Sequence, residues 1–349
     1  MDRRLELSLR YARKRISSNE AIGGWVGGSL TAGLGNPRSD VDVFLLHDGA
    51  VDPPVEQVID DGVRIDIEFR RMSDMERLLD DLAVLSDDPR DGLDKVPSLG
   101  RLDDAARLFY AIPADEGAGA RLLSAVRQRE DVLRRSRILR AASICSSKSE
   151  DVQGAVEAGD PRQQLEISGR LLLEALEAYT AGCGQYYVGH KWGFAKLRAT
   201  PHHEALSDSL DGVFHDVPLS AATAVSMRRV ALAQQLLAAA FALGWEHPGA
   251  AGWAACAGGS TSPAWRPDPQ WVPVRYGDTV LLEGLDKTIH VRLSATGLLL
   301  WSLAAALPAP DACRALAVLA PSVSESTPPD EEIAAYLDTL CRQGLLLPV

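Results

Sequence analysis

The residues Val26-Gly27-Gly28-Ser29, followed ten residues later by Asp40-Val41-Asp42-Val43-Phe44-Leu45-Leu46, decide the fold predicted for the start of this chain. Glycine has no Cβ atom, so Gly27 and Gly28 can adopt positive φ and bring backbone N–H groups close to an anion. The Ser29 hydroxyl adds a further donor to the same turn. The pattern predicts a phosphate-binding turn of a size suited to a triphosphate.

The strand after this turn carries two acidic side chains on one face. Side chains alternate along a strand, so Asp40 and Asp42 point one way while the valines beside them enter the core. Adjacent carboxylates repel each other unless a cation lies between them, and oxygen ligands of this kind suit Mg²⁺ that carries substrate phosphates. A second alternating strand over 63–69 contains Asp66. If the two strands pair, Asp66 completes a cluster of three carboxylates able to hold two metal ions.

This constellation resembles the nucleotidyltransferases of the DNA polymerase β superfamily, particularly the small ones that modify antibiotics. The resemblance covers roughly residues 1–115 and implies an α+β catalytic domain that uses an NTP, with ATP favoured, and Mg²⁺. By resemblance, Gly28 and Ser29 hold the nucleotide phosphates, while Asp40, Asp42 and Asp66 are catalytic and bind two Mg²⁺ ions.

Two further observations bear on the phosphate site. Many members of that superfamily carry an arginine three residues after the serine, where this chain has Ala32, and Arg38 is the candidate to supply the contact instead. On the residues alone, the glycines also fit an ordinary tight turn and the aspartates a solvated strand face. The spacing and the third carboxylate together favour the catalytic interpretation.

The composition limits the classes of protein to be considered. The chain has 349 residues, 46% of them apolar, and a net charge of −12, which predicts a globular protein of two or three domains. Its negative charge argues against a nucleic-acid partner, which would require a basic surface. Five scattered cysteines without a Cys-x-x-Cys pair fit a reducing cytoplasm. The longest apolar run, 236–245, is far too short for a membrane span, and the N-terminus has no secretory signal.

Residues 116–248 are predicted to form an all-α helical domain that closes the catalytic cleft. Residues 186–198 resemble a segment that lines the cleft in small-molecule nucleotidyltransferases, and this implies that Lys191 meets the triphosphate and that Tyr187 or Trp192 stacks on a base. Aromatic packing between helices with surface lysines is the alternative. The same region holds three candidates for a general base, Glu166, Glu174 and Glu177. The alternative is that these glutamates lie on a solvated helix face.

Residues 249–270, rich in Gly, Ala, Ser and Pro, are predicted to be a linker. Beyond it, three short strands ending near Leu293 and three helices are expected, the first of them capped by Ser294. This order resembles the pyrroloquinoline-quinone biosynthesis protein D family, small winged-helix domains (β3α3) that bind the leader of a ribosomally made precursor peptide. The resemblance covers about residues 271–349. It implies leader binding at the third strand and the last helix, through Thr288, Ile289, His290, Val291, Arg292 and Arg342.

The sequence therefore predicts a three-part cytoplasmic enzyme that transfers NMP, with AMP favoured, from NTP to a precursor peptide, without a nucleic-acid or membrane partner. Two alternatives stay open. In one, the acceptor is a small alcohol or amine such as an antibiotic-like metabolite. In the other, the first domain is a scaffold without activity and the chain delivers a peptide to a separate enzyme.

Overall fold

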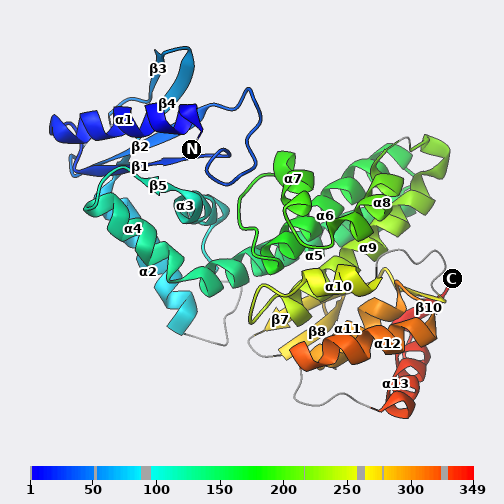
Figure 1. The fold of residues 1–349 in the computed structure, drawn as a ribbon. Coiled ribbons are helices and arrows are strands. Elements are labelled where there is room, and N and C mark those ends of the chain that lie inside the picture. Colours follow the sequence, from blue (N-terminus) through cyan, green and yellow to red (C-terminus); the bar gives the residue numbers. More distant parts are fainter. Residues whose placement is uncertain are drawn as a thin grey trace. The chain divides into compact units, whose positions relative to one another are not determined.

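The computed structural model describes residues 2–50, 53–87, 96–215, 217–257, 264–276, 279–323 and 329–349. By its internal contacts the chain divides into two compact units. The first comprises Met1–Asp88, Pro97–Leu133 and Tyr187–Trp192, and the second Pro89–Val96, Arg134–Tyr186 and Gly193–Val349. Small sheets and a helix-rich body make this a mixed α/β protein (Figure 1). None of its described helices has both the length and the apolar character needed to cross a membrane.

The first unit contains a five-stranded sheet with order β3-β4-β2-β1-β5. Its elements follow the chain as α1 (Arg3–Ser17), β1 (Gly23–Gly27), β2 (Val41–His47), β3 (Glu56–Asp60), β4 (Val63–Arg71), α2 (Met72–Asp87), α3 (Leu99–Tyr110), β5 (Ile112–Pro113) and α4 (Ala118–Arg127). Strands β2 and β4 are parallel, whereas the other neighbours are antiparallel. The predicted pairing of the two acidic strands is therefore present.

Alternation of side chains builds the core of this unit. Val41 and Val43 of β2 and Ile65 and Ile67 of β4 are fully buried on the same side of the sheet. Helix α1 covers them with an apolar stripe that includes Leu5 and Leu9. The helix begins after Asp2, whose carboxylate accepts a hydrogen bond from the Arg4 amide, as expected of an N-cap. On the opposite face, Asp42 of β2 is followed by the buried Phe44 and Leu46, and β4 presents Asp66 and Glu68 on the same side.

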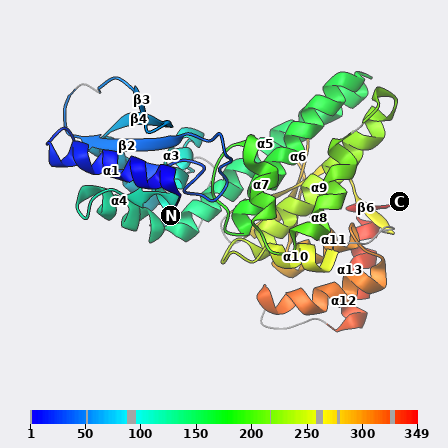
Figure 2. The same ribbon diagram turned by 45° about the horizontal axis from the view of Figure 1, so that its top comes forward.

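The second unit is dominated by long helices. They are α5 (Glu130–Glu157), which begins in the first unit, α6 (Pro161–Gly182), α7 (Gly193–Arg198), α8 (His203–Phe214), α9 (Ala222–Leu243) and α10 (Ala251–Ala257), with a 3₁₀ turn at Leu219–Ala221. A further 3₁₀ turn, His190–Trp192, belongs to the first unit. Helices α6 and α9 lie side by side over much of their length (Figures 1 and 2). Helix α9 is buried nearly all round, because its many alanines allow neighbours to approach on every side.

The C-terminal segment of the second unit contains two sheets and three α-helices. Strands β7 (Trp271–Tyr276), β8 (Thr279–Gly284) and β9 (His290–Leu293) form an antiparallel sheet in that order, and β6 (Trp265–Pro267) pairs with β10 (Leu346–Pro348). The helices are α11 (Ala295–Ala304), α12 (Ala309–Leu319) and α13 (Asp330–Arg342), with a 3₁₀ turn at Ala320–Ser322. Ser294 caps α11 as predicted, accepting a hydrogen bond from the Gly297 amide.

The structure differs from the expected division of the chain in three places. The first unit continues to Leu133 and includes α4, whereas the expected boundary lay at residue 115. Helix α10 and strand β6 lie within the predicted linker 249–270, of which residues 258–263 are outside the described part. Residues 134–186 and 193–349 belong to one unit, because the C-terminal segment packs on α9. Gly and Pro content did not reveal this packing.

Candidate active site

The turn after β1 brings backbone and carboxylate into close contact. Gly27 ends β1 directly opposite Asp42 of β2, and the next residue, Gly28, has a φ of +96°. A Cβ atom at position 28 would lie 2.3 Å from Asp42 Oδ2. Any larger residue there would therefore displace the carboxylate, in addition to the strain that positive φ imposes on a side chain. Glycine is required here by both the backbone angle and the neighbouring aspartate.

The rest of this turn is a compact loop held by its own backbone. The Thr31 hydroxyl donates to the Gly28 carbonyl at 2.9 Å, and the Leu34 amide donates to the Ser29 carbonyl at 2.9 Å. Ser29 itself is buried, with 8% of its surface exposed. Hydrogen bonds between residues of the loop fix its path. The loop thereby holds Gly28 and Ser29 next to the start of β2, where Asp42 lies.

A face of four carboxylates lies across β2 and β4. Asp42 is the parallel register partner of Asp66, and Glu68 follows two residues further along the same face of β4. Burial is the main cause that raises the pKa of Asp42 to about 6, and the charge of Asp40 is the next. The charges of Glu68 and Asp66 also raise the pKa of Asp42, whereas the Arg107 guanidinium of α3 lowers it. The four carboxylates are close enough to repel one another.

Asp40 and Asp66 have protein partners in this structure. The Arg64 guanidinium forms an ion pair with Asp40 and lies 3.8 Å from Asp66 Oδ1, measured from Nε. Gln57 Nε2 also donates to Asp66 Oδ1 at 2.7 Å. Across the described ranges, no three Asp, Glu, His or Cys side chains already stand together as a metal site. The aspartates share a face, but two of them are turned toward neighbouring side chains.

Tyr187 joins this site from a distant part of the sequence. Residues Tyr187–Trp192 belong to the first unit, where the Tyr187 ring packs edge-on against Tyr110 of α3 at 6.1 Å between centroids. Burial first, and then the charge of Asp42, raises the pKa of Tyr187 to about 12. The phenol is therefore neutral at physiological pH and lies within electrostatic reach of Asp42. Its buried ring packs against protein, whereas the sequence suggested stacking on a base.

Two predicted phosphate ligands, Lys191 and Arg38, are bonded to other groups or lie beside them. Lys191 is exposed, and its ammonium sits 5.1 Å from the centre of the Trp192 ring. Arg38 is exposed, and its backbone amide donates to Asn36 Oδ1 at 2.8 Å. Within the described part of the chain, neither side chain makes an ion pair or hydrogen bond with the three aspartates. Their proposed contact with phosphate remains a prediction.

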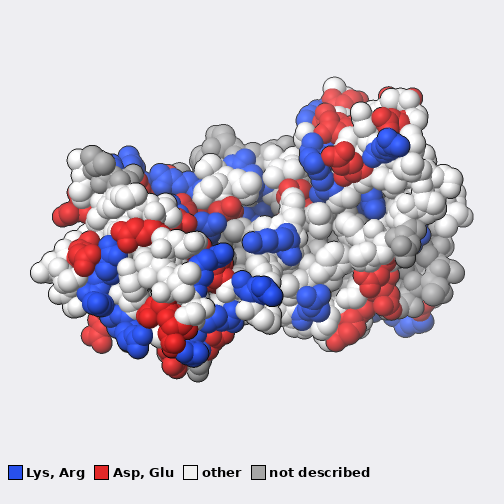
Figure 3. Space-filling view, turned by 90° about the horizontal axis from the view of Figure 1, so that it is seen from above, with Lys and Arg blue, Asp and Glu red and all other residues white. Residues whose placement is uncertain are grey.

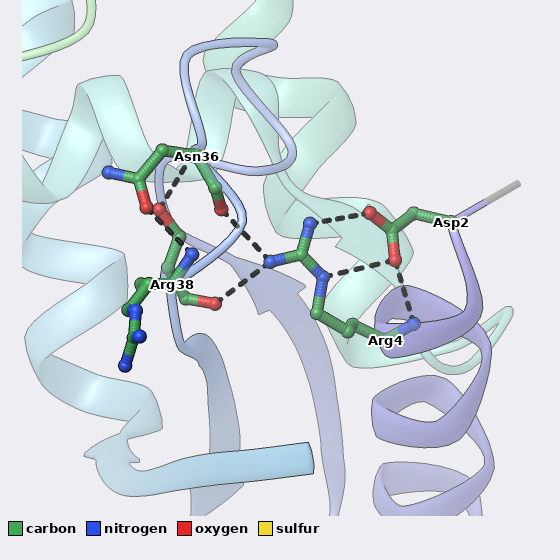
Figure 4. Close-up of polar contacts among 5 residues, drawn as sticks. Asp2, Arg4, Asn36 and Arg38 are labelled. Carbon is green, nitrogen blue, oxygen red and sulfur yellow. Dashed lines mark hydrogen bonds and ion pairs between the residues drawn. The ribbon is translucent and has the colours of Figure 1, made fainter. Parts of the chain in front are cut away.

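Arg4 is a residue of this site that the sequence did not reveal. Its guanidinium is braced by Asp2 and donates to the carbonyls of Asn36 and Ser39 at 3.0 and 3.1 Å. Figure 4 shows Arg4 between Asp2 and the loop, with the Arg38 guanidinium directed away from it. Arg4 therefore anchors the residues that precede Asp40 to the start of α1. Two other arginines of α1 pair with acidic groups, Arg10 with Asp60 and Arg15 with Glu56.

The candidate general bases lie on α6 in the second unit. Glu177 is buried and accepts hydrogen bonds from Lys196 and, at 2.7 Å, from Arg137. Burial lowers the pKa of Lys196, and the charge of Glu177 partly opposes that effect. Glu166 is exposed and pairs with Arg170 at 2.8 Å. The Glu177 carboxylate is thus the centre of a buried ion cluster, in which Lys196, left without a role by the sequence, is one of its two cationic partners.

The predicted peptide-binding residues fall on β9, the loop before it and α13. Strand β9 begins at His290 and lies at the edge of its sheet, paired only with β8 among the described strands. Thr288 and Ile289 precede the strand in a turn closed by the Gly284 amide, which donates to the Ile289 carbonyl. Val291 is half-buried, whereas Arg292 is exposed. The Arg342 guanidinium bonds to residues of its own helix, Asp338 and Thr339.

Comparison with known proteins finds distant similarity among solved structures. No family model and no curated protein matches the chain. Among solved structures, the chain is similar to a nucleotidyltransferase-like protein from Exiguobacterium sibiricum, with 12% identity and a TM-score of 0.39. The match covers 68% of this chain and 77% of that one.

Proposed function

We propose that the first unit catalyses Mg²⁺-dependent transfer of a nucleoside monophosphate, from ATP as the favoured donor, to an acceptor. The observation that carries this proposal is the contact between the Gly28 turn and the Asp42 carboxylate, with Asp66 beside it on the parallel strand. Backbone N–H groups in such a turn suit phosphate, and paired carboxylates suit the cation that accompanies phosphate. Both halves of a nucleotide-binding site thus meet at one point.

The donor set fits Mg²⁺, because Asp40 just before β2, Asp42 of β2 and Asp66 of the neighbouring β4 all offer oxygen ligands. On binding the metal, Asp40 would give up its ion pair with Arg64, and Asp66 would give up its hydrogen bond from Gln57. Arg64 would then lie beside the bound nucleotide. When bound, Mg²⁺ would neutralise negative charge on the phosphate oxygens. Three carboxylates suit two ions, as two-metal phosphoryl-transfer sites require.

In the proposed reaction, a lone pair of the acceptor forms a bond to the α-phosphorus, and the bond from that phosphorus to the bridging oxygen breaks. Pyrophosphate leaves with the electron pair, and the acceptor proton passes to solvent or a base. The turn residues Gly28 and Ser29 bind and orient the phosphates, and Arg107 faces the same carboxylates. Positioning and charge stabilisation supply most of the catalysis in reactions of this kind.

We further propose that the acceptor is a ribosomally made precursor peptide, held at β9 in a C-terminal region with winged-helix character. An edge strand can pair with an added strand, and Ile289 and Arg292 offer exposed apolar and cationic groups beside it. The net charge of −12 favours such an acceptor over a nucleic acid. On the face drawn in Figure 3, acidic and basic side chains are interspersed.

The catalytic proposal is tested by pyrophosphate release from each NTP with Mg²⁺, in the presence of candidate acceptors. Asp42→Asn should reduce turnover by more than about 100-fold, because it removes a charge central to the site. Asp60→Asn is the matched control, since Asp60 is an exposed carboxylate of the same unit that pairs with Arg10. Equal turnover in Asp42→Asn and wild type would disprove the assignment.

The peptide proposal is tested by point substitution, because truncation at residue 271 would remove β7 and α11, which pack on α9. Fluorescein-labelled peptides encoded by short reading frames beside the gene are titrated against wild type, Ile289→Asp and Arg292→Glu. Binding weakened by both substitutions supports the proposal. If no such peptide binds, or if hydroxyl or amine metabolites are modified equally well by all three proteins, a small-molecule acceptor replaces the peptide.

A further inference from the structure

A groove of about 550 Å³ lies entirely within the first unit, at the end of β4. One wall is a single face of α3, on which Gly100, Asp103, Asp104 and Arg107 recur at helical spacing. The other wall is the end of β4 around Arg70, together with the first turn of α2. Most of this lining is polar, so a ligand of the groove should carry polar groups of its own.

The charged side chains of the groove differ in whether they already have partners. Three of its four arginines bond to other parts of the protein: Arg70 to Glu68, Arg71 to the Ala50 carbonyl and Arg101 to the Asp74 carbonyl. Arg107 is half-buried, and within the described ranges its guanidinium makes no hydrogen bond or ion pair. A guanidinium with five N–H donors is therefore left for a group that enters the groove.

The aspartates of the groove do not cancel this charge. The lining has four arginines and only three aspartates. Asp74 pairs with Arg77 of its own helix, and Asp104 lies 3.6 Å from Arg70. The groove is thus more cationic than the carboxylate face of β2 and β4, and its charge favours an anion.

The groove begins where the carboxylate face ends. Glu68 and Arg70 follow Asp66 at alternate positions of β4, so the three side chains share one face, and Arg70 lies about 13 Å along the strand from Asp66. The Arg70 guanidinium covers the ring of Phe44, which follows Asp42 on the same face of β2. From the α3 side, the positive charge of Arg107 lowers the pKa of Asp42. A ligand in the groove therefore lies next to the proposed metal site.

The direction of the strands indicates which substrate this place suits. Phosphoryl transfer requires the attacking and leaving atoms to lie in line, on opposite sides of the phosphorus. In the proposed reaction Gly28 and Ser29 hold the phosphates, so pyrophosphate leaves toward the turn at the start of β2. Strand β4 runs parallel to β2, and the groove lies at its far end. The groove is on the side from which the acceptor must approach.

We propose that this groove binds the acceptor of the transfer reaction through an oxyanion, a carboxylate or a phosphate group, held by Arg107. A planar guanidinium can bind either group through two parallel hydrogen bonds. On a precursor peptide the oxyanion would be an acidic or phosphorylated side chain close to the modified residue. The acceptor role rests on the function proposed above, whereas binding of an oxyanion by the groove does not.

The first test compares three small probes in ligand-observed NMR titrations with the full chain in EDTA. N-acetyl-L-aspartate amide carries a carboxylate, N-acetyl-O-phospho-L-serine amide carries a phosphate, and N-acetyl-L-asparagine amide carries neither. At least one anionic probe should bind saturably and at least about 5-fold more tightly than the neutral probe, as expected for hydrogen bonds to a charged group. The tighter anionic probe identifies the oxyanion. Equal affinities of all three probes would overturn the proposal.

Two variants locate the binding. Arg107→Gln should reduce the affinity of the anionic probe to that of the neutral probe, and its melting curve checks that the variant is folded. Arg121→Gln is the matched control, because it removes the same charge from an exposed position of α4 outside the groove. Anion binding that is unchanged in Arg107→Gln, or that falls equally in both variants, would contradict the assignment of Arg107.

A final titration separates the acceptor from the nucleotide. Saturation with Mg²⁺ and adenosine 5′-(α,β-methylene)triphosphate, whose α,β bridge resists cleavage, should leave the anionic probe bound, because turn and groove lie on opposite sides of the α-phosphate. If the nucleotide displaces the probe, Arg107 belongs to the nucleotide site and the acceptor assignment is overturned. If the nucleotide does not bind while the probe still binds through Arg107, the proposed transfer reaction is wrong and the anion groove stands.

Discussion

Replacing Asp42 by asparagine should stabilise the metal-free protein at neutral pH. Burial and the neighbouring carboxylates raise the pKa of Asp42 from the ordinary 3.8 to about 6. The folded state therefore binds this proton more tightly than the unfolded state does. Ionisation costs folded stability as pH rises from about 4 through 6, and the full cost is present above that range. An asparagine side chain has a similar shape without the charge, so the variant avoids this cost.

The expected magnitude follows from the size of the pKa difference. At about 1.4 kcal/mol per pKa unit, a rise from 3.8 to about 6 corresponds to roughly 3 kcal/mol. Asp42 is not fully buried and solvent screens part of the repulsion, so we expect a gain of about 1–3 kcal/mol at pH 8. At roughly 2–4 °C per kcal/mol, the transition of the first unit should rise by several degrees.

Differential scanning calorimetry in EDTA at pH 8 and at pH 4 measures this effect for wild type, Asp42→Asn and Asp60→Asn. The gain in Asp42→Asn should be largest at pH 8 and almost absent at pH 4, while the exposed Asp60→Asn control changes by less than about 1 kcal/mol. Mg²⁺ should raise the melting temperature of wild type more than that of Asp42→Asn. The reasoning is refuted if Asp42→Asn melts below wild type at pH 8 in EDTA, or if the difference does not depend on pH.

Two other substitutions test the structure at separate points. If the first unit has the proposed transferase activity, Gly28→Ala should lower it by more than about 100-fold, because the new Cβ atom would lie 2.3 Å from Asp42 Oδ2. Gly33→Ala is the control, because Gly33 has a φ of +73° and nothing lies within 4 Å of its Cβ position. This variant should lose about 1 kcal/mol of folding stability but retain activity. Similar activities of Gly28→Ala and Gly33→Ala would contradict this role of Gly28. Lys196→Met should lower the free energy of unfolding by about 3–5 kcal/mol in urea titrations, because it removes one partner of the buried Glu177. Arg170→Ala, which breaks an exposed pair, should cost less than about 1 kcal/mol, and equal losses in the two variants would refute the assignment of Lys196 to a buried ion cluster.

Much of the fold could be predicted because its signals are local. Alternation along 41–46 and 63–69 predicted two strands with acidic faces, and the structure pairs them in parallel with Asp42 beside Asp66. The helix at the N-terminus and the Ser294 cap follow from apolar spacing and capping chemistry, which act over a few residues. Glycine at position 28 could also be singled out, since its conformational freedom is a property of the residue itself.

The surroundings of the site could not be predicted in this way. Arg64 and Gln57 reach Asp40 and Asp66 because of the register between β2, β3 and β4, and register depends on side-chain packing across the whole sheet. Arg4 binds the carbonyls of a loop more than thirty residues away, which no spacing pattern contains.

The sequence by itself determined which residues have the chemistry for nucleotide and metal, because residue type and alternation fix the functional groups and the face they occupy. Tertiary structure alone decided their environment. It placed Tyr187 with the first unit and gave Lys196 to a buried ion pair with Glu177. The physical reason is that burial, charge and hydrogen bonding at these positions depend on segments that are distant in sequence and meet only on folding.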